Sequence, residues 1–278
     1  MTDILYCPYL NKSKTPVGAL HVYEEATIRL RITKSYNIYD LKIIVENDTK
    51  EVLRKPLYLI PEYDNFYNVC KQICFVQNGK IIFACLGDHH FDASINGLVP
   101  ISTTWPSMHS EEDIDSVIEQ VQLFITSVGF KTGCVNIESR INTIDGKAYL
   151  IDIGARSGGN YTPFVIQYAT GFNFVEAMLD FSMEHTDTKQ IPVYNGYYAY
   201  MVMHSKEAGI LKGITIAEKL KSHILERHDY IKRGQNVRSF RGANAACGVL
   251  LVKFDSNEQM QDYVNHMNSY VKVCVLNI

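Results

Sequence analysis

Short runs of alternating apolar and polar residues begin at about residue 38 and are interspersed with helical patterns. Two β-rich runs, residues 70–77 and 80–86, are separated only by Asn78 and Gly79, a pair that tolerates the positive φ angles of a tight turn. This spacing predicts a β-hairpin. The order of strands and helices is typical of α+β or α/β lobes.

A long helical pattern fills residues 110–128. Ser110 can cap the first turn, the acidic residues that follow it suit the positive end of a helix, and Gly129 marks the end. The apolar residues at helical spacing are Ile114, Val117, Ile118, Val121, Phe124, Ile125 and Val128. They predict one amphipathic helix with a single buried stripe.

Further helices are predicted in the second half of the chain. Pro163 and Gly171 bracket a short one, and Asn173 can cap another that runs to about residue 183. Ser256 opens a last helix, whose expected core stripe is Met260, Tyr263, Met267 and Tyr270. Residues 195–254 are rich in Tyr, Val and Gly, which favours strands that cross back over a sheet.

Composition narrows the class of protein. The chain has 278 residues, of which 46% are hydrophobic and 21% charged, so it can bury a substantial core as one large domain or two lobes. This composition excludes disordered and collagen-like chains. A formal net charge of -3, with no dense run of Lys or Arg, argues against a nucleic-acid-binding or membrane-surface protein.

Targeting signals and cysteine usage indicate a cytoplasmic location. No stretch reaches the roughly 18 consecutive apolar residues of a membrane helix, and the first residues carry no secretion signal. The seven cysteines are odd in number and scattered, as expected of reduced thiols in a cytosol. Cys70 and Cys74 are the close pair, but with no His or second Cys pair beside them in the sequence a zinc site is not expected.

A second hairpin is predicted from Gly133 to about residue 155, turning at Asp145 and Gly146. Side chains alternate between the faces of a strand. One face of the first strand therefore carries Asn136, Glu138 and Arg140, and one face of the returning strand carries Leu150, Asp152, Gly154 and Arg156.

The length of the turn decides whether these two faces meet. A three-residue loop at 144–146, with Gly146 left-handed, pairs Thr143 with Lys147 and places Glu138 opposite Asp152. A two-residue loop would put the acids on opposite faces. We therefore predict the odd-length loop.

Opposed carboxylates in this hairpin are typical of a metal site. Two such groups repel at roughly 5 Å unless a cation lies between them, and hard oxygen ligands favour Mg²⁺. Arg156 offers a fork of donors for phosphate oxygens. Gly158 and Gly159 allow close backbone approach to an anion, and the free amides of a helix starting at 162–163 would add positive potential. The alternative is a solvent-exposed pair of hairpin carboxylates without a ligand.

These residues resemble the metal-binding hairpin of the ATP-grasp superfamily, whose usual pattern is a first Glu followed by Glu-x-Asn-x-Arg. The sequence is most similar to the branch that contains L-amino acid ligases and biotin-carboxylase or carbamoyl-phosphate-synthase-like enzymes, over roughly residues 32–275. The resemblance implies an α+β ATP-grasp fold of two lobes with mostly antiparallel sheets. Residues 1–66 would form a partial, divergent small lobe, and residues 67–278 the large carboxy-terminal lobe.

The resemblance also implies roles for individual residues. Glu138 and Asp152 would be magnesium ligands, and Arg156 would contact the transferred phosphate as the catalytic residue. The residues expected to bind the nucleotide are Asn160, Gly158 and Gly159, with Glu62 from the adenine hinge at 59–63.

Several positions depart from the family pattern. The stretch 21–32 lacks both the Lys-Pro pair and the glycines of the flap that closes over ATP, and the family's separate amino-terminal domain has no counterpart. Pro61 replaces one acid of the hinge. Asp152 is one methylene shorter than the usual Glu, and Gly154 replaces the usual Asn.

The function implied is that of an ATP- and Mg²⁺-dependent ligase. It would phosphorylate a small-molecule carboxylate to an acylphosphate, which an amine or thiol then attacks. His89 and His90 could also reach substrate or metal, but as strand neighbours they point to opposite faces, so one of them is expected to lie away from the site.

Two other functions stay open. The chain could be a non-catalytic, degenerate ATP-grasp subunit that serves as a binding partner. It could also be half of a split ligase, completed by a partner chain that supplies the missing domain or by a second copy in a homo-oligomer.

Overall fold

The computed structural model describes residues 69–276, apart from 93, 143–145 and 184–189, together with the backbone of six strands before residue 57. Contacts divide the chain into two units, Met1–Tyr63 and Asp64–Ile278. In the first unit the strands form antiparallel pairs: β1 (Ile4–Leu5) with β4 (Arg31–Ile32), β2 (Lys14–Thr15) with β3 (Thr27–Ile28), and β5 (Lys42–Asn47) with β6 (Lys50–Pro56). Glu62 and the rest of the predicted hinge lie outside the described residues.

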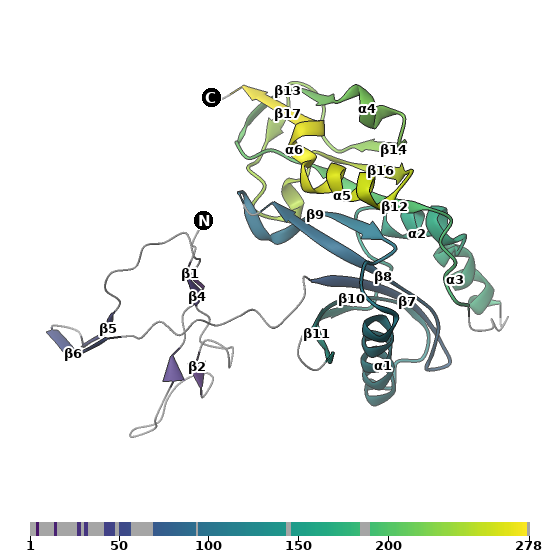
Figure 1. Ribbon diagram of the computed structural model, residues 1–278, viewed down its shortest axis with the longest axis horizontal. Coiled ribbons are helices and arrows are strands. Elements are labelled where there is room, and N and C mark those ends of the chain that lie inside the picture. The colour runs from purple at the N-terminus through teal and green to yellow at the C-terminus, as the bar shows by residue number, and fades with distance from the viewer. Residues whose placement is uncertain are drawn as a thin grey trace. The chain divides into compact units, whose positions relative to one another are not determined.

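An eight-stranded sheet forms the framework of the second unit, with the order β11-β10-β7-β8-β9-β12-β16-β14 (Figure 1). Every pairing between these strands is antiparallel. The strands are β7 (Cys70–Gln77), β8 (Lys80–Asp92), β9 (Asn96–Trp105), β10 (Gly133–Ile141), β11 (Ala148–Gly154), β12 (Tyr197–Met203), β14 (Ile224–Asp229) and β16 (Gly248–Phe254).

The first hairpin is confirmed. Strands β7 and β8 are joined by Asn78 and Gly79, whose φ angles of 50° and 76° are both left-handed. An Asn-Gly turn of this kind matches the twist of the strands that it connects.

Helix α1 (Glu111–Val128) covers one face of β7, β8 and β10, as the sequence predicts. Ser110 caps it by accepting a hydrogen bond from the Asp113 amide, and Gly129 ends it at a φ of 66°. The cluster beneath it includes Cys74, Val76, Ala84, Leu86, Val117, Val121, Ile125, Val135, Ile137 and Ile141, all buried. Of the predicted stripe, Val117, Val121 and Ile125 are the fully buried members.

The second hairpin, β10 with β11, has the predicted register but not the predicted loop. Glu138 lies opposite Asp152. However, the Asn142 amide donates to the Lys147 carbonyl, so the loop at 143–146 has an even number of residues. The partner of Ser139 is Leu150, which leaves Ile151 as an extra residue in β11. This bulge offsets the longer loop and returns the two acids to the same level of the sheet.

The remaining elements complete a second core around β12 and β16. Helices α2 (Thr162–Thr170) and α5 (Asn257–Asn265) both contact β12. A three-stranded sheet of order β15-β13-β17 follows, with β13 (Gly209–Ile216), β15 (Asn236–Val237) and β17 (Val271–Leu276). The short elements are α3 (Phe174–Ser182), α4 (Glu218–Lys221), η1 (Ala243–Ala245) and α6 (Met267–Tyr270).

The predicted helix caps are present, but the last helix is not continuous. Asn173 and Ser256 each accept hydrogen bonds from the first turn of the helix that they precede. The final helix ends at His266 and a separate turn, α6, carries Met267 and Tyr270, which are still buried. The described fold is therefore α+β with mostly antiparallel sheets, and none of its helices is long and apolar enough to cross a membrane.

Candidate functional site

Polar side chains gather on the sheet face opposite α1. Strand alternation puts Val135 and Ile137 of β10 under α1 and turns Asn136 and Glu138 to the other side. Lys71 of β7 lies directly opposite Glu138 in the register. These strands therefore have one apolar face and one face that carries charged and polar groups.

Glu138 and Asp152 occupy neighbouring strands at the same level. The Glu138 side chain is 36% exposed, and Asp152 is exposed. His89, followed by Lys71 and Arg156, holds the pKa of Glu138 below its usual range. Glu138 is therefore ionised at neutral pH, as a metal ligand must be.

Lys71 is the buried cation of this face. Its side chain is only 6% exposed, and its ammonium lies 5.5 Å from the ring centroid of Tyr200. Burial, followed by the charge of Arg156, lowers the pKa of Lys71 to about 8. A buried ammonium is costly unless an anion compensates it, and Glu138 supplies part of that compensation.

A chain of hydrogen bonds runs from His89 across the sheet. His89 Nδ1 lies 2.6 Å from Thr103 Oγ1, and Thr103 donates to Tyr200 Oη at 2.6 Å. Tyr200 in turn hydrogen-bonds the Asn160 side chain. The other ring nitrogen of His89, Nε2, faces Glu138 Oε1 at 3.7 Å, and this interaction lowers the pKa of the Glu138 carboxyl.

His89 is held neutral and aimed at the site. It is buried, and burial lowers the pKa of its imidazole. Among the described residues, His89 Nε2 has no hydrogen-bond partner. An imidazole nitrogen and a carboxylate that face each other at this distance can share a proton or hold a cation between them.

Gly158 closes against the same face. Its φ of 93° is left-handed, and a Cβ there would lie 3.2 Å from both Asn136 Oδ1 and Ile73 Cδ1. Asn136 is buried, and its Oδ1 has no hydrogen-bond partner in the described part of the chain. Gly158 is therefore required by both conformation and space, whereas Gly159 has open surroundings.

Arg156 folds back over Gly154. A Cβ at position 154 would lie 3.3 Å from Arg156 Nε, so glycine leaves room for the arginine side chain. Its charge lowers the pKa values of both Glu138 and Lys71, which places it within electrostatic reach of both residues. Glycine at position 154 thus has a local structural reason.

The first-turn amides of α2 were expected to be free, and this expectation is wrong. The Thr162 amide donates to the Gly159 carbonyl, the Phe164 and Val165 amides donate to Tyr161, and Pro163 has no amide proton. These amides are therefore not free for an anion. The two residues before the helix, Asn160 and Tyr161, have left-handed φ angles of 53° and 58°, which is a strained conformation for two non-glycine residues.

A polar cleft of about 480 Å³ adjoins the site through His89. It lies between the end of β8 and the segment at 264–268. Asp92 lines the cleft, accepts a hydrogen bond from Asn268 and lies 3.8 Å from the buried Nε2 of His204. The cleft has room for a small molecule next to His89.

Sequence reasoning missed Lys71 and Tyr200 and left His89 undecided. A lysine within the apolar run of β7 was the available signal, but its relation to Glu138 depends on pairing between β7 and β10, which are distant in the sequence. Tyr200 is further removed, on β12. Of the two histidines, His89 lies in the site, and His90 points to the other face and contacts Thr104.

No family model and no curated protein matches the sequence. Solved structures do match, with low identity. Phosphoribosylglycinamide synthetase from Anaerococcus prevotii is 16% identical with a TM-score of 0.60, over 75% of this chain and 53% of that one. L-amino acid ligase from Bacillus licheniformis is also 16% identical, with a TM-score of 0.64 over 75% and 54% of the two chains.

A third similar structure contains a nucleotide. The biotin carboxylase domain of Hydrogenobacter thermophilus 2-oxoglutarate carboxylase, in complex with MgADP and bicarbonate, is 13% identical with a TM-score of 0.55, over 77% of this chain and 47% of that one. The chain thus spans about half the length of the structures that it matches. Together with the antiparallel architecture and the hairpin register, these matches show that this chain has the ATP-grasp fold.

Proposed function

We propose that the protein is an ATP- and Mg²⁺-dependent ligase that joins a small-molecule carboxylate to an amine or a thiol. The observation that carries this proposal is the convergence of Glu138, Asp152, Lys71 and Arg156 on one face of a fold shared with ATP-grasp ligases. Opposed carboxylates beside two cations suit a metal ion and a phosphate chain together.

The side chains present fit a magnesium ion. Glu138 and Asp152 offer hard oxygen donors from adjacent strands, and Glu138 is kept ionised. Magnesium usually takes one or two carboxylates and completes its coordination with water and phosphate oxygens. When bound, the ion would neutralise charge on the phosphate chain.

Lys71 and Arg156 would act on the phosphoryl group itself. Both are cations within electrostatic reach of Glu138. Lys71 is largely protonated at neutral pH and is fixed by burial, and Arg156 can offer two parallel donors. They would stabilise the charge that develops on the equatorial oxygens during transfer.

The proposed reaction has two balanced steps. A carboxylate oxygen attacks the γ-phosphorus of ATP, and ADP leaves. The amine nitrogen then attacks the acyl carbon, inorganic phosphate leaves, and the amine gives up a proton. The imidazole of His89, which is neutral and lines the polar cleft, would accept that proton.

A screen for ADP release over pairs of carboxylates and amines tests this proposal. We expect Mg²⁺-dependent release with a matching pair, and a loss of roughly 10³-fold in rate for Arg156→Ala, the scale of an arginine that stabilises phosphoryl transfer. Glu138→Gln should lose activity as well. Arg233→Ala and Glu119→Gln, exposed residues outside the site, serve as charge-matched controls.

Two results would contradict the proposal. One is ADP release that is indifferent to both site substitutions, which would indicate a contaminating ATPase. The other is the absence of release for every pair when nucleotide binding is intact.

The second outcome favours a non-catalytic binding protein. Two observations support this alternative. Asp152 is exposed, and the first-turn amides of α2 already have hydrogen-bond acceptors. A protein of this kind would bind ATP through Glu138 and Lys71 without turning it over.

A further inference from the structure

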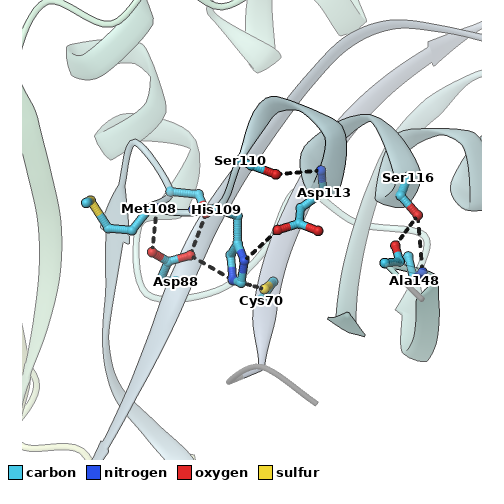
Figure 2. A network of polar contacts seen from close by, with 10 residues as sticks. Cys70, Asp88, Met108, His109, Ser110, Asp113, Ser116 and Ala148 are labelled. Atoms are coloured by element: carbon cyan, nitrogen blue, oxygen red, sulfur yellow. Dashed lines mark hydrogen bonds and ion pairs between the residues drawn. The ribbon is translucent and has the colours of Figure 1, made fainter. Parts of the chain in front are cut away.

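A second cluster of ligand-type side chains lies at the α1 end of the sheet, on the face opposite Glu138. Cys70 begins β7, and Asp88 is its register partner on β8. His109 stands two residues before α1. Cys70 Sγ is 3.0 Å from His109 Nε2, which is 3.8 Å from Asp88 Oδ1 (Figure 2).

Hydrogen bonds already hold the groups of this cluster in position. Asp88 Oδ1 accepts from the Ser107 hydroxyl at 2.6 Å, and Asp88 Oδ2 accepts from the Met108 amide at 2.8 Å. On the other side of the imidazole, Asp113 Oδ2 lies 3.7 Å from His109 Nδ1 (Figure 2). Asp113 itself is fixed in the first turn of α1, where its amide donates to Ser110.

Burial distinguishes this cluster from an ordinary surface group. Cys70 is fully buried, and the side chains of His109, Asp88 and Asp113 are 11%, 15% and 16% exposed. Two carboxylates bring two negative charges against at most one positive charge from the imidazole. Arg140 of β10 also acts on Cys70 and offsets part of this excess.

The cluster is unsuited to nucleophilic chemistry. Burial, followed by Asp88 and Asp113, raises the pKa of the Cys70 thiol far above its ordinary value. A reactive cysteine needs an electropositive surrounding that favours the thiolate. Cys70 instead has two half-buried carboxylates beside it, those of Asp88 and Asp113.

We propose that Cys70, Asp88 and His109 bind a zinc ion, with Asp113 orienting the imidazole. One sulfur, one nitrogen and one oxygen atom all lie within 4.8 Å of one another. In a tetrahedral site with the usual zinc bond lengths of about 2.0–2.3 Å, such atoms are roughly 3.5 Å apart, so shifts below 1 Å complete the geometry.

The types of donor atom determine which metal the site prefers and how that metal would be coordinated. Thiolate and imidazole favour zinc over magnesium, which separates this site from the carboxylates on the other face. Three protein ligands leave a fourth position for water. A carboxylate on the far nitrogen of a metal-bound histidine is a common second partner, and Asp113 occupies that place.

We expect the zinc ion to hold separate segments of the chain together, with water in the open position. Zinc would join the start of β7, the second half of β8 and the segment just before α1. The first and last of its ligands, Cys70 and His109, are 39 positions apart in the sequence. The proposal does not depend on ATP or on a ligase reaction, and its test is performed without nucleotide.

Metal titration of the untagged, metal-stripped protein tests the proposal directly. With Zn²⁺ we expect one ion per chain, held in competition with a chromophoric chelator. With Co²⁺ we expect a thiolate-to-cobalt charge-transfer band and tetrahedral d–d absorption. Cys70→Ser should abolish the charge-transfer band. Cys74→Ser, which removes another buried thiol of β7, should leave it unchanged.

Two further variants distinguish the metal ligand His109 from Asp113, the residue that orients its imidazole. His109→Ala should lose zinc binding, whereas Asp113→Asn should keep it with an affinity roughly 10- to 100-fold lower. X-ray absorption at the zinc edge of the wild-type protein requires no variant to fold and should show one sulfur in the coordination shell. A shell of nitrogen and oxygen only, no binding by the wild type, or a cobalt spectrum unchanged in Cys70→Ser would overturn the proposal.

Discussion

The two faces of β7, β8 and β10 are built from alternate residues of the same strands and have different compositions. Ile137 points toward α1 and is fully buried among aliphatic side chains. Glu138, the next residue, points away and faces His89 and Lys71. Lys71 and His89 are nearly as buried as Ile137, so the polar face is not simply the solvent side of an amphipathic sheet.

The difference in composition gives the two faces different effects on stability. Burial of aliphatic groups stabilises the fold by about 25 cal/mol for each Å² removed from water. Burial of an ammonium and an imidazole carries a desolvation cost that aliphatic residues of similar size would avoid. The polar face therefore stabilises the fold less than an aliphatic face would, which supports the proposal that it binds a charged ligand.

Substitution of adjacent residues gives the largest contrast between the faces. We expect Ile137→Ala to lower the free energy of unfolding by about 2–5 kcal/mol, because it removes fully buried methyl groups and leaves a cavity. Glu138→Gln should cost less, about 1–2 kcal/mol, because its side chain is 36% exposed and the substitution removes only part of the compensation for Lys71. Urea unfolding followed by circular dichroism measures both. Equal losses at the two positions would show that the faces do not differ in this way.

The cost of burying Lys71 on the polar face should depend on pH. We expect Lys71→Met to be more stable than the wild type at pH 7, because methionine fills the same space without a buried charge. The pKa of Lys71 is about 8 in the folded protein, below its ordinary value of 10.5. Between these values the unfolded chain binds more protons, so the wild type gains stability as pH rises.

The advantage of Lys71→Met should therefore shrink by about 1.4 kcal/mol for each pH unit above 8. Urea unfolding of both proteins between pH 7 and about 9.5 measures this difference. The buried thiols also make stability depend on pH, but this contribution is the same in both proteins and drops out of the difference. A difference that does not vary with pH would contradict the burial of a charged Lys71.

Two neighbouring glycines give the smallest contrast. Gly158→Ala should cost about 1–3 kcal/mol, because its φ is positive and a Cβ would press on Asn136 and Ile73. Gly159→Ala should change stability by less than about 0.5 kcal/mol, because its nearest neighbour would lie 3.9 Å away. Thermal unfolding of the two variants checks this. Similar midpoints would show that the loop is not packed against the polar face.

Local patterns were sufficient to predict many of the elements. The Asn78-Gly79 hairpin and the capped helix α1 depend on residues close together in the sequence, and both are present. The pairing of Glu138 with Asp152 was predicted correctly although the predicted loop length was wrong. The extra residue at the Ile151 bulge restores the register that the longer loop would otherwise shift. A bulge of this kind has no clear signature in the residues of the strand.

Contacts between distant strands could not be predicted in the same way. The pairing of β7 with β10 brings Lys71 to Glu138, and the approach of the residues before α1 to β7 brings His109 to Cys70. No sequence spacing encodes either of these contacts. His109 therefore lies beside Cys70 although no histidine is near Cys70 in the sequence.

The central proposal is that the sheet face carrying Glu138, opposite α1, binds magnesium and polyphosphate. Calorimetric titration of the wild type and of Glu138→Gln with ATP, with and without Mg²⁺, tests this most directly. We predict saturable heat and a raised melting temperature for the wild type that require Mg²⁺, and a loss of both in Glu138→Gln. The absence of heat and of thermal stabilisation in the wild type at millimolar ATP, or binding that is unchanged in Glu138→Gln, would contradict the account.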